Sequence, residues 1–83
     1  MPDAARTERQ RLRKEIKTLQ DRAELTADAF NSFQSSVVAL VFQDVADDVI
    51  EEQRDKATFY YEAFLDINIR IGKLTRQLAA LSK

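Results

Sequence analysis

The chain has 83 residues, with 13 lysines and arginines against 14 aspartates and glutamates, and it contains no cysteine or histidine. The missing cysteine excludes disulfides, thiolate nucleophiles and zinc ribbons, and the missing histidine removes the usual general base and the commonest transition-metal ligand. One glycine is too few for a phosphate-binding loop. We therefore expect a protein that is not an enzyme, holds no cofactor and acts on no small-molecule substrate.

The composition favours helices. Apolar residues make up 45 % of the chain, which contains one glycine and one proline. Strand-and-turn folds need more of both residues, whereas long helices need neither. We predict a single all-α domain over residues 1–83. The lack of cysteine, of a signal-peptide core and of a run of about 18 apolar residues favours a cytoplasmic protein with no membrane partner.

The first predicted helix covers about residues 4–44. Within it, positions alternate at spacings of four and three, and all but one of them are apolar. They are Leu12, Ile16, Leu19, Ala23, Thr26, Phe30, Phe33, Val37 and Leu40. This heptad spacing is typical of a helix that packs along one stripe against another helix.

The second predicted helix covers about residues 48–81 and has a stripe of the same kind. Its members are Ile50, Gln53, Ala57, Tyr60, Phe64, Ile67, Ile71, Leu74, Leu78 and Leu81. Extending the first stripe would place Asp44, Asp47 and Glu51 in a core, so the spacing predicts a turn at 44–48. There, Asp48 followed by Glu51 resembles a capping box, which would start the second helix.

A second possible break lies at residues 31–36, which contain an asparagine and three serines. These residues are poor helix formers and good caps. The first stripe nevertheless continues through them, so we favour one unbroken helix and a long antiparallel hairpin. The alternative is a three-helix bundle with a break near 31–36.

Several large apolar side chains lie outside both stripes. A two-helix hairpin would leave them in water, which is unusual for a contiguous group in a soluble monomer. We therefore expect two hairpins to pair into a four-helix bundle as a homodimer. The candidate protein-interaction residues are Val38, Phe42, Phe59, Tyr61, Leu65 and Ile69.

The charges are unevenly distributed. Residues 1–22 carry a net charge of +3, residues 23–56 a net charge of -6, and residues 57–83 a net charge of +2. A hairpin would thus have a basic terminal end and an acidic turn end. Solubility and the helix dipoles account for much of this pattern. An alternative is nucleic-acid contact by Arg9, Arg11, Arg13, Lys14 and Lys17, although the net charge of -1 and the absence of aromatic residues in this segment argue against it.

The acidic residues near the turn have spacings that would suit a Mg²⁺ or Ca²⁺ ion, but we interpret them as a solvated surface. They are Asp44, Asp47, Asp48, Glu51, Glu52 and Asp55. All these features favour a small non-enzymatic protein-interaction module that acts as a regulator, inhibitor or adaptor by binding a partner protein. The alternatives are a nucleic-acid-associated helical protein and a structural coiled-coil subunit of a larger assembly.

Overall fold

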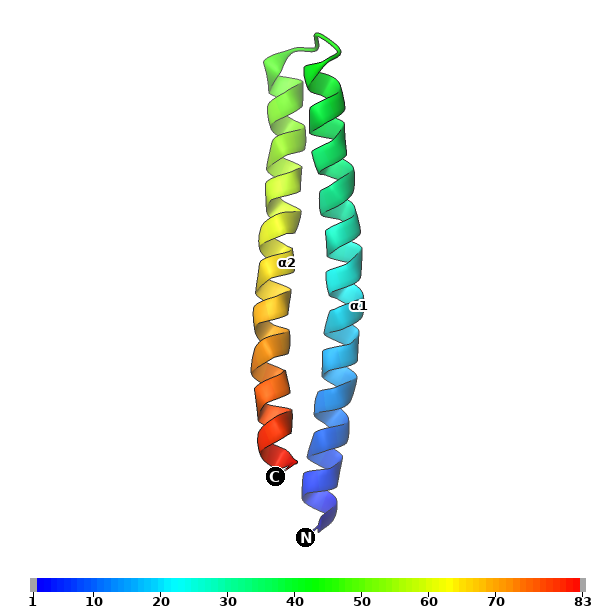
Figure 1. Cartoon of the computed structure of the whole chain (residues 1–83), viewed down its shortest axis with the longest axis vertical. Helices are drawn as coiled ribbons and strands as arrows, with labels where there is room; N and C mark the ends of the chain where they lie inside the picture. The colour runs from blue at the N-terminus through cyan, green and yellow to red at the C-terminus, as the bar shows by residue number, and fades with distance from the viewer. Residues whose placement is uncertain (1, 83) are drawn as a thin grey trace.

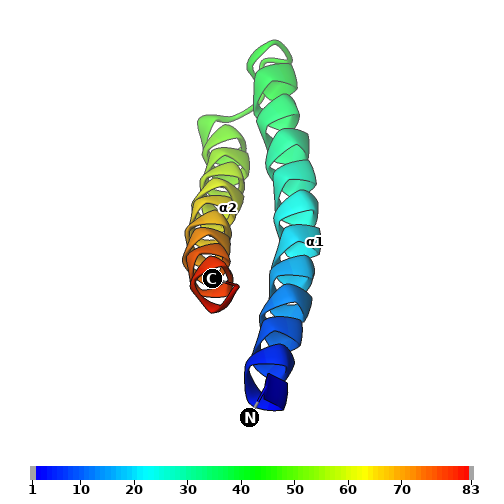
Figure 2. The same cartoon turned by 60° about the horizontal axis from the view of Figure 1, so that its bottom comes forward.

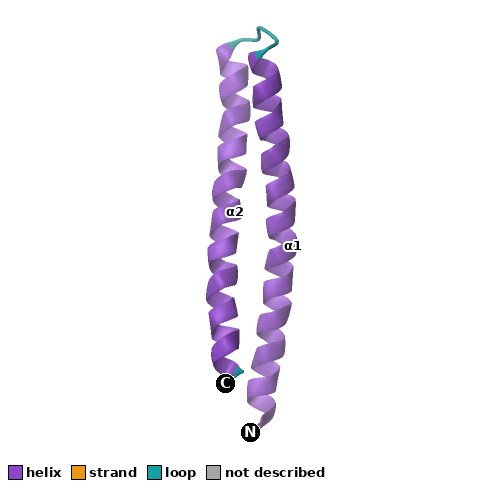
Figure 3. Cartoon of the chain, viewed as in Figure 1, coloured by secondary structure: helices purple, strands orange, loops and turns teal. Residues whose placement is uncertain are grey.

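The computed structural model describes residues 2–82, which form two long helices joined by a short turn (Figure 1). Helix α1 spans Pro2–Val41 and helix α2 spans Asp47–Leu81. The helices run antiparallel and place both termini at the same end, as Figures 1 and 3 show. The Cα extents are 66 × 14 × 14 Å, so the hairpin is a narrow rod. The prediction of an all-α antiparallel hairpin is confirmed.

The two predicted stripes form the contact between the helices, which we call the seam. Every residue of both stripes is buried or half-buried. Full burial occurs near the termini, where Leu12 is 0 % and Leu74 is 2 % exposed and both pack with Ile16. Figure 2 shows the two helices side by side along their length, with no further element covering either of them. Two helices alone therefore give a core one stripe wide.

The two polar members of the seam are both hydrogen-bonded. The Thr26 hydroxyl donates to the Arg22 carbonyl oxygen at 2.6 Å, within its own helix. The Gln53 side-chain oxygen accepts from the Ser36 hydroxyl across the seam at 3.4 Å. Burying a polar group is costly only when it lacks such a partner. This explains how the heptad pattern continues through these two positions.

Helix α1 continues without a break through residues 31–36. Asn31, Ser32 and Ser35 are exposed on its outer side, and Ser36 contacts α2 through Gln53. Burial of Phe30, Phe33 and Val37 in the seam outweighs the low helix propensity of the polar residues. The alternative three-helix bundle with a break near 31–36 is therefore wrong.

The turn covers residues 42–46, two residues earlier than the predicted 44–48. The backbone N–H groups of Phe42 and Gln43 donate to carbonyls three residues back, at 3.2 and 3.1 Å, and so tighten the last turn of α1. Asp44 then adopts a φ of 51°, in the left-handed region that aspartate tolerates better than most residues. Asp44 thus supplies, within the turn, a backbone conformation that glycine often provides.

The predicted capping box at Asp48 and Glu51 is wrong. The N-cap of α2 is Ala46, which has an extended backbone and no side-chain cap. Asp48 lies inside the first turn of α2 and accepts a hydrogen bond from the N–H of Val49 at 3.0 Å. Asp47 and Asp48 also place negative charge beside the exposed N–H groups at this helix end. The helix start is thus stabilised by charge in its first turn rather than by a capping side chain.

Candidate protein-interaction surface

Aromatic rings dominate the seam near the turn. Phe33 and Tyr60 stack across it, with ring centroids 5.5 Å apart and planes 8° from parallel. Phe30 meets Tyr61 at 5.4 Å, and Phe59 meets Tyr60 edge-on at 5.2 Å. Such arrangements stabilise beyond simple burial. Because only two helices contribute, each ring is covered on part of its surface and the remainder lines a groove.

The first groove, which we call the Tyr61 groove, has a volume of about 330 Å³. It lies between the helices, and most of its lining is apolar. The lining residues are Phe30, Gln34, Val37, Val38, Arg54, Ala57, Thr58 and Tyr61. Arg54 is the one charged residue among them, so the groove offers an apolar floor with a cationic edge.

The apolar surface extends from this groove along α2. Leu65 and Ile69 follow Tyr61 at steps of four residues, so the three side chains lie along one side of the helix. Leu65 is 42 % and Ile69 57 % exposed. We call the surface formed by Val38, Tyr61, Leu65 and Ile69 the Tyr61 face.

A second groove, of about 520 Å³, lies on another side of the hairpin. Phe59 lines it, and because Phe59 and Tyr61 are two residues apart, their side chains point about 200° apart around α2. Lys56 lies over the Phe33 ring, 5.7 Å from its centroid, and pairs with Glu52 at 3.5 Å. Three charged side chains, Glu52, Asp55 and Lys56, thus line this second groove.

The six predicted interaction residues are all exposed, but the structure does not gather them into one patch. Val38 and Tyr61 share the Tyr61 groove, and Leu65 and Ile69 extend it. Phe59 lines the second groove, and Phe42 is 84 % exposed in the turn. Whether any of them binds a protein stays a prediction.

Three groove residues were missing from the predicted set, namely Gln34, Arg54 and Thr58. All three flank the seam positions in the heptad pattern, on the side that also carries Val38 and Tyr61. Their heptad positions could therefore have identified them as residues that flank the seam. What the sequence lacked was the axial alignment of the two helices, which decides that Gln34 and Thr58 line the same groove.

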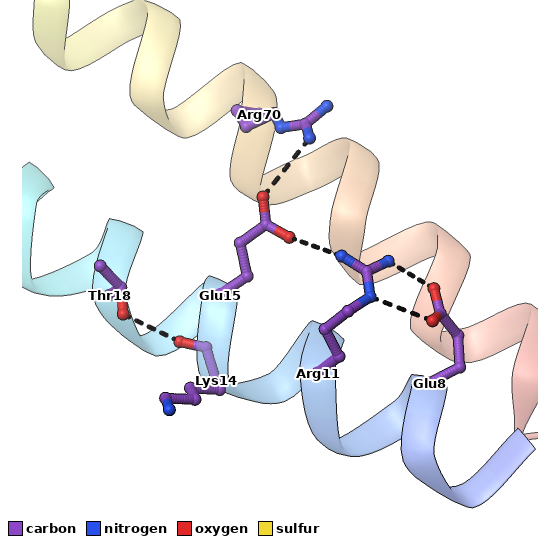
Figure 4. A network of polar contacts seen from close by, with 6 residues as sticks. All are labelled: Glu8, Arg11, Lys14, Glu15, Thr18 and Arg70. Atoms are coloured by element: carbon purple, nitrogen blue, oxygen red, sulfur yellow. Dashed lines mark hydrogen bonds and ion pairs between the residues drawn. The ribbon is translucent and has the colours of Figure 1, made fainter. Parts of the chain in front are cut away.

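At the terminal end, several of the predicted nucleic-acid contacts bind within the hairpin instead. Arg9 donates to the carbonyl oxygen of Leu81 at 3.2 Å and so ties α1 to the end of α2. Figure 4 shows the Arg11 guanidinium between the carboxylates of Glu8 and Glu15. Glu15 in turn pairs with Arg70 of α2 at 3.4 Å. This network joins the two helices on the side of Glu15, which we call the ion-pair side.

These contacts favour the charged forms of the side chains that make them. The hydrogen bond and charge of Arg11 keep the pKa of Glu8 below its ordinary value of 4.5, and Glu8 raises the pKa of Arg11. Lys17 pairs with Asp21 at 2.7 Å, which raises the pKa of Lys17. Within residues 4–82, Arg13 and Lys14 have no carboxylate within 4.0 Å. Arg9 also has no carboxylate within 4.0 Å among these residues, but it donates to the Leu81 carbonyl oxygen. Nucleic-acid binding by these five side chains stays a prediction.

In the part of the chain that the structure describes, no three acidic side chains come together in a way that could hold a metal ion. Over the same residues, neither helix combines the length and apolar character needed to cross a membrane. Comparison with family models, curated proteins and solved structures found no match to the chain.

Proposed function

We propose that the chain is a small non-enzymatic interaction module that binds another protein chain through its Tyr61 face and acts as a regulator, inhibitor or adaptor in the cytoplasm. The observation that carries this proposal is the exposed apolar surface of Tyr61, Leu65 and Ile69, continuous with an apolar groove between the helices. A surface of this kind on a small protein is typical of an interaction site.

The total surface area supports the same proposal. The hairpin exposes 6340 Å², whereas a compact folded monomer of this mass exposes about 5,100 Å². The difference of roughly 1,200 Å² exceeds the 800 Å² or so that each partner contributes to a standard protein interface. One docked chain would thus bring the exposed area down to that of an ordinary globular protein.

The geometry favours a helical partner. The Tyr61 groove and its extension run along the rod axis, as an amphipathic helix requires of its docking site. Side chains of the partner spaced three and four residues apart would lie along Tyr61, Leu65 and Ile69.

The test is to identify the partner by affinity capture from the source cell and then titrate the purified partner against four forms of the chain. These are the natural chain, Tyr61→Glu, Leu65→Glu and the control Leu25→Glu. Leu25 is 70 % exposed and shares its heptad position with Arg11, toward the ion-pair side. We expect the first two variants to weaken binding by about 30-fold or more and the control to bind normally. Equal affinity of all four forms for the partner would contradict the proposal.

A second candidate function is a structural subunit, and the rod shape favours it. With a Cα extent of 66 Å and a width of 14 Å, the hairpin would serve as a spacer in a larger assembly. It would then form extended higher oligomers without a regulatory target. Electron microscopy of the purified chain at high concentration separates the two candidates, since the interaction module forms no filament or ring.

A further inference from the structure

We propose that the chain bound at the Tyr61 face is a second copy of this protein, lying so that the turn end of each copy adjoins the terminal end of the other. This inference rests on the proposed function, because it names the partner of the same face. The result is a four-helix bundle with its twofold axis perpendicular to the rod. Three features carry the inference: the pattern of residues along α2, the charge of the two ends and the exposed area.

The first feature is that Leu65 lies at the middle of the exposed apolar stripe of α2, between Tyr61 and Ile69. Tyr61 and Ile69 lie four residues to either side of it, and Thr58 and Gly72 lie seven residues to either side. A twofold interface brings the same surface of each copy together, so residues equidistant from the axis face each other. With Leu65 on the axis, each Tyr61 meets Ile69 of the second copy, and an aromatic ring packs on an aliphatic chain.

Gly72 fits the same arrangement. Glycine in the middle of a helix is unfavourable by about 1 kcal/mol relative to alanine. Nothing in the hairpin explains it, since a Cβ built at Gly72 meets no atom within 4 Å. In the twofold arrangement, Gly72 faces Thr58 of the second copy, and its missing side chain lets the two α2 helices approach closely.

The second feature is the charge of the two ends, which selects the direction of pairing. Residues 1–22 carry a net charge of +3 and residues 23–56 a net charge of -6. A twofold axis along the rod would place the two acidic turn ends side by side. The perpendicular axis instead places the acidic turn end of one copy beside Arg13, Lys14 and Lys17 of the other. Complementary charges of this kind fix the orientation of an interface.

The third feature is that each chain exposes roughly 1,200 Å² more surface than a compact monomer of its mass. Pairing two copies through one face covers surface on both at once, and standard interfaces need about 800 Å² per partner. The excess on each hairpin is therefore sufficient for a stable dimer.

The experiment uses cross-linking of cysteine variants, which is free of background because the chain has no cysteine of its own. Glu51→Cys and Ala79→Cys mark the two ends of α2 at exposed positions 14 residues to either side of Leu65. Within one helix the two sites lie about 42 Å apart, too far for a short bismaleimide. The two variants are mixed in equal amounts, allowed to exchange and treated with the reagent.

We expect the mixed cross-link, which joins a Glu51→Cys chain to an Ala79→Cys chain, to exceed both self-cross-links at least tenfold. Light scattering should give twice the monomer mass of 9.6 kDa. High salt should weaken this dimer, because opposite charges attract at its ends. Dominant self-cross-links, or a dimer that high salt strengthens, would overturn the proposed direction. A monomer mass would overturn the self-association while leaving the capture of a different partner by the Tyr61 face as a separate result.

A matched pair of variants tests the face itself. Leu65→Glu places two carboxylates at the twofold axis and should raise the dimer dissociation constant about 30-fold or more. Leu25→Glu makes the same chemical change on α1, toward the ion-pair side, and should leave it unchanged. Circular dichroism confirms that both variants stay helical. Equal dissociation constants for the two variants would show that the Tyr61 face is not the interface.

Discussion

The terminal half of the hairpin and its turn half use the same heptad seam with different results. Near the termini, Leu12 and Leu74 are almost completely buried and pack with Ile16. Near the turn, the seam residues Phe30, Phe33 and Tyr60 are only half-buried. The terminal half is also joined across the helices by Arg9 and Leu81 and by Glu15 and Arg70.

The difference follows from the shape of the side chains. Branched aliphatic residues interdigitate, and at Leu12, Ile16 and Leu74 one stripe from each of two helices is enough to bury them. A ring is broader than the contact between two helices, and ring pairs with centroids 5.4 and 5.5 Å apart leave an outer edge uncovered. The terminal half therefore contains the most completely buried residues, whereas the turn half leaves ring edges exposed along its two grooves.

The strongest way to break this comparison is to remove one apolar side chain from each half. Leu74→Ala removes a fully buried leucine and should cost about 2–5 kcal/mol of unfolding free energy. Val37→Ala removes a half-buried residue beside the Tyr61 groove and should cost about 1 kcal/mol. Urea unfolding at one fixed protein concentration measures both. Similar losses would show that the two halves are equally well packed.

A smaller effect is expected from changing the ring stack while keeping an apolar side chain. Phe33→Leu removes the stacking on Tyr60 and the contact with Lys56. The expected loss is about 0.5–1.5 kcal/mol, the usual additional contribution of an aromatic pair. Thermal unfolding of this variant is compared with Phe64→Leu, another seam phenylalanine on α2. A larger loss at Phe64 would contradict the importance of the Phe33 stack.

The contrast between the halves was only partly predictable from the sequence. Heptad spacing identifies the seam residues, since one helical period decides which side chains face the other helix. It also identifies Tyr61 and Leu65 as lying outside the seam. It does not give the axial alignment of the helices, which decides that Phe33 stacks on Tyr60 and that Val38 shares a groove with Tyr61. That alignment depends on the packing of both helices together.

The turn shows another limit of sequence reasoning. Asp48 and Glu51 have the spacing of a capping box, yet the helix begins from Ala46. The turn closes earlier because Asp44 takes a left-handed conformation and the last carbonyls of α1 are satisfied by residues 42 and 43. Several aspartates in this segment were comparable candidates for the break. Local preferences alone could not decide between starting points two residues apart.

Gly72→Ala sharpens the distinction between stability of the hairpin and pairing of two copies. In dilute solution the variant should unfold at a higher temperature, with a gain of about 0.5–1 kcal/mol, because alanine favours the helix and a Cβ has free space. At high concentration it should dimerise less tightly than the natural chain, since the added methyl group lies between the two α2 helices. Ala29→Gly, on the ion-pair side of α1, is the reverse control away from the Tyr61 face. If the variant both unfolds at a higher temperature and dimerises more tightly, Gly72 does not lie in the interface.

The smallest expected effect concerns the ion pairs of the terminal half. Arg11 keeps the pKa of Glu8 below its ordinary value of 4.5, so the folded state favours the charged carboxylate. The resulting stabilisation is present above pH 4.5 and is lost as the pH falls below 4.5 through the folded-state pKa. Because Glu8 is on the surface, salt should screen the effect.

Glu8→Gln measures this contribution directly. Its melting temperature should lie slightly below that of the natural chain at pH 7. The difference should shrink as the pH falls through the folded-state pKa of Glu8, because protonation then removes the charge from Glu8 in the natural chain. Glu62→Gln is the control, since Glu62 has no basic partner within 4.0 Å among residues 4–82. A difference that does not shrink as the pH is lowered, or that is equally large in the control, would mean that the Glu8–Arg11 pair adds nothing to the stability of the terminal half. The terminal half would then be held closed by Leu12, Ile16 and Leu74, together with the Arg9–Leu81 hydrogen bond and the Glu15–Arg70 ion pair.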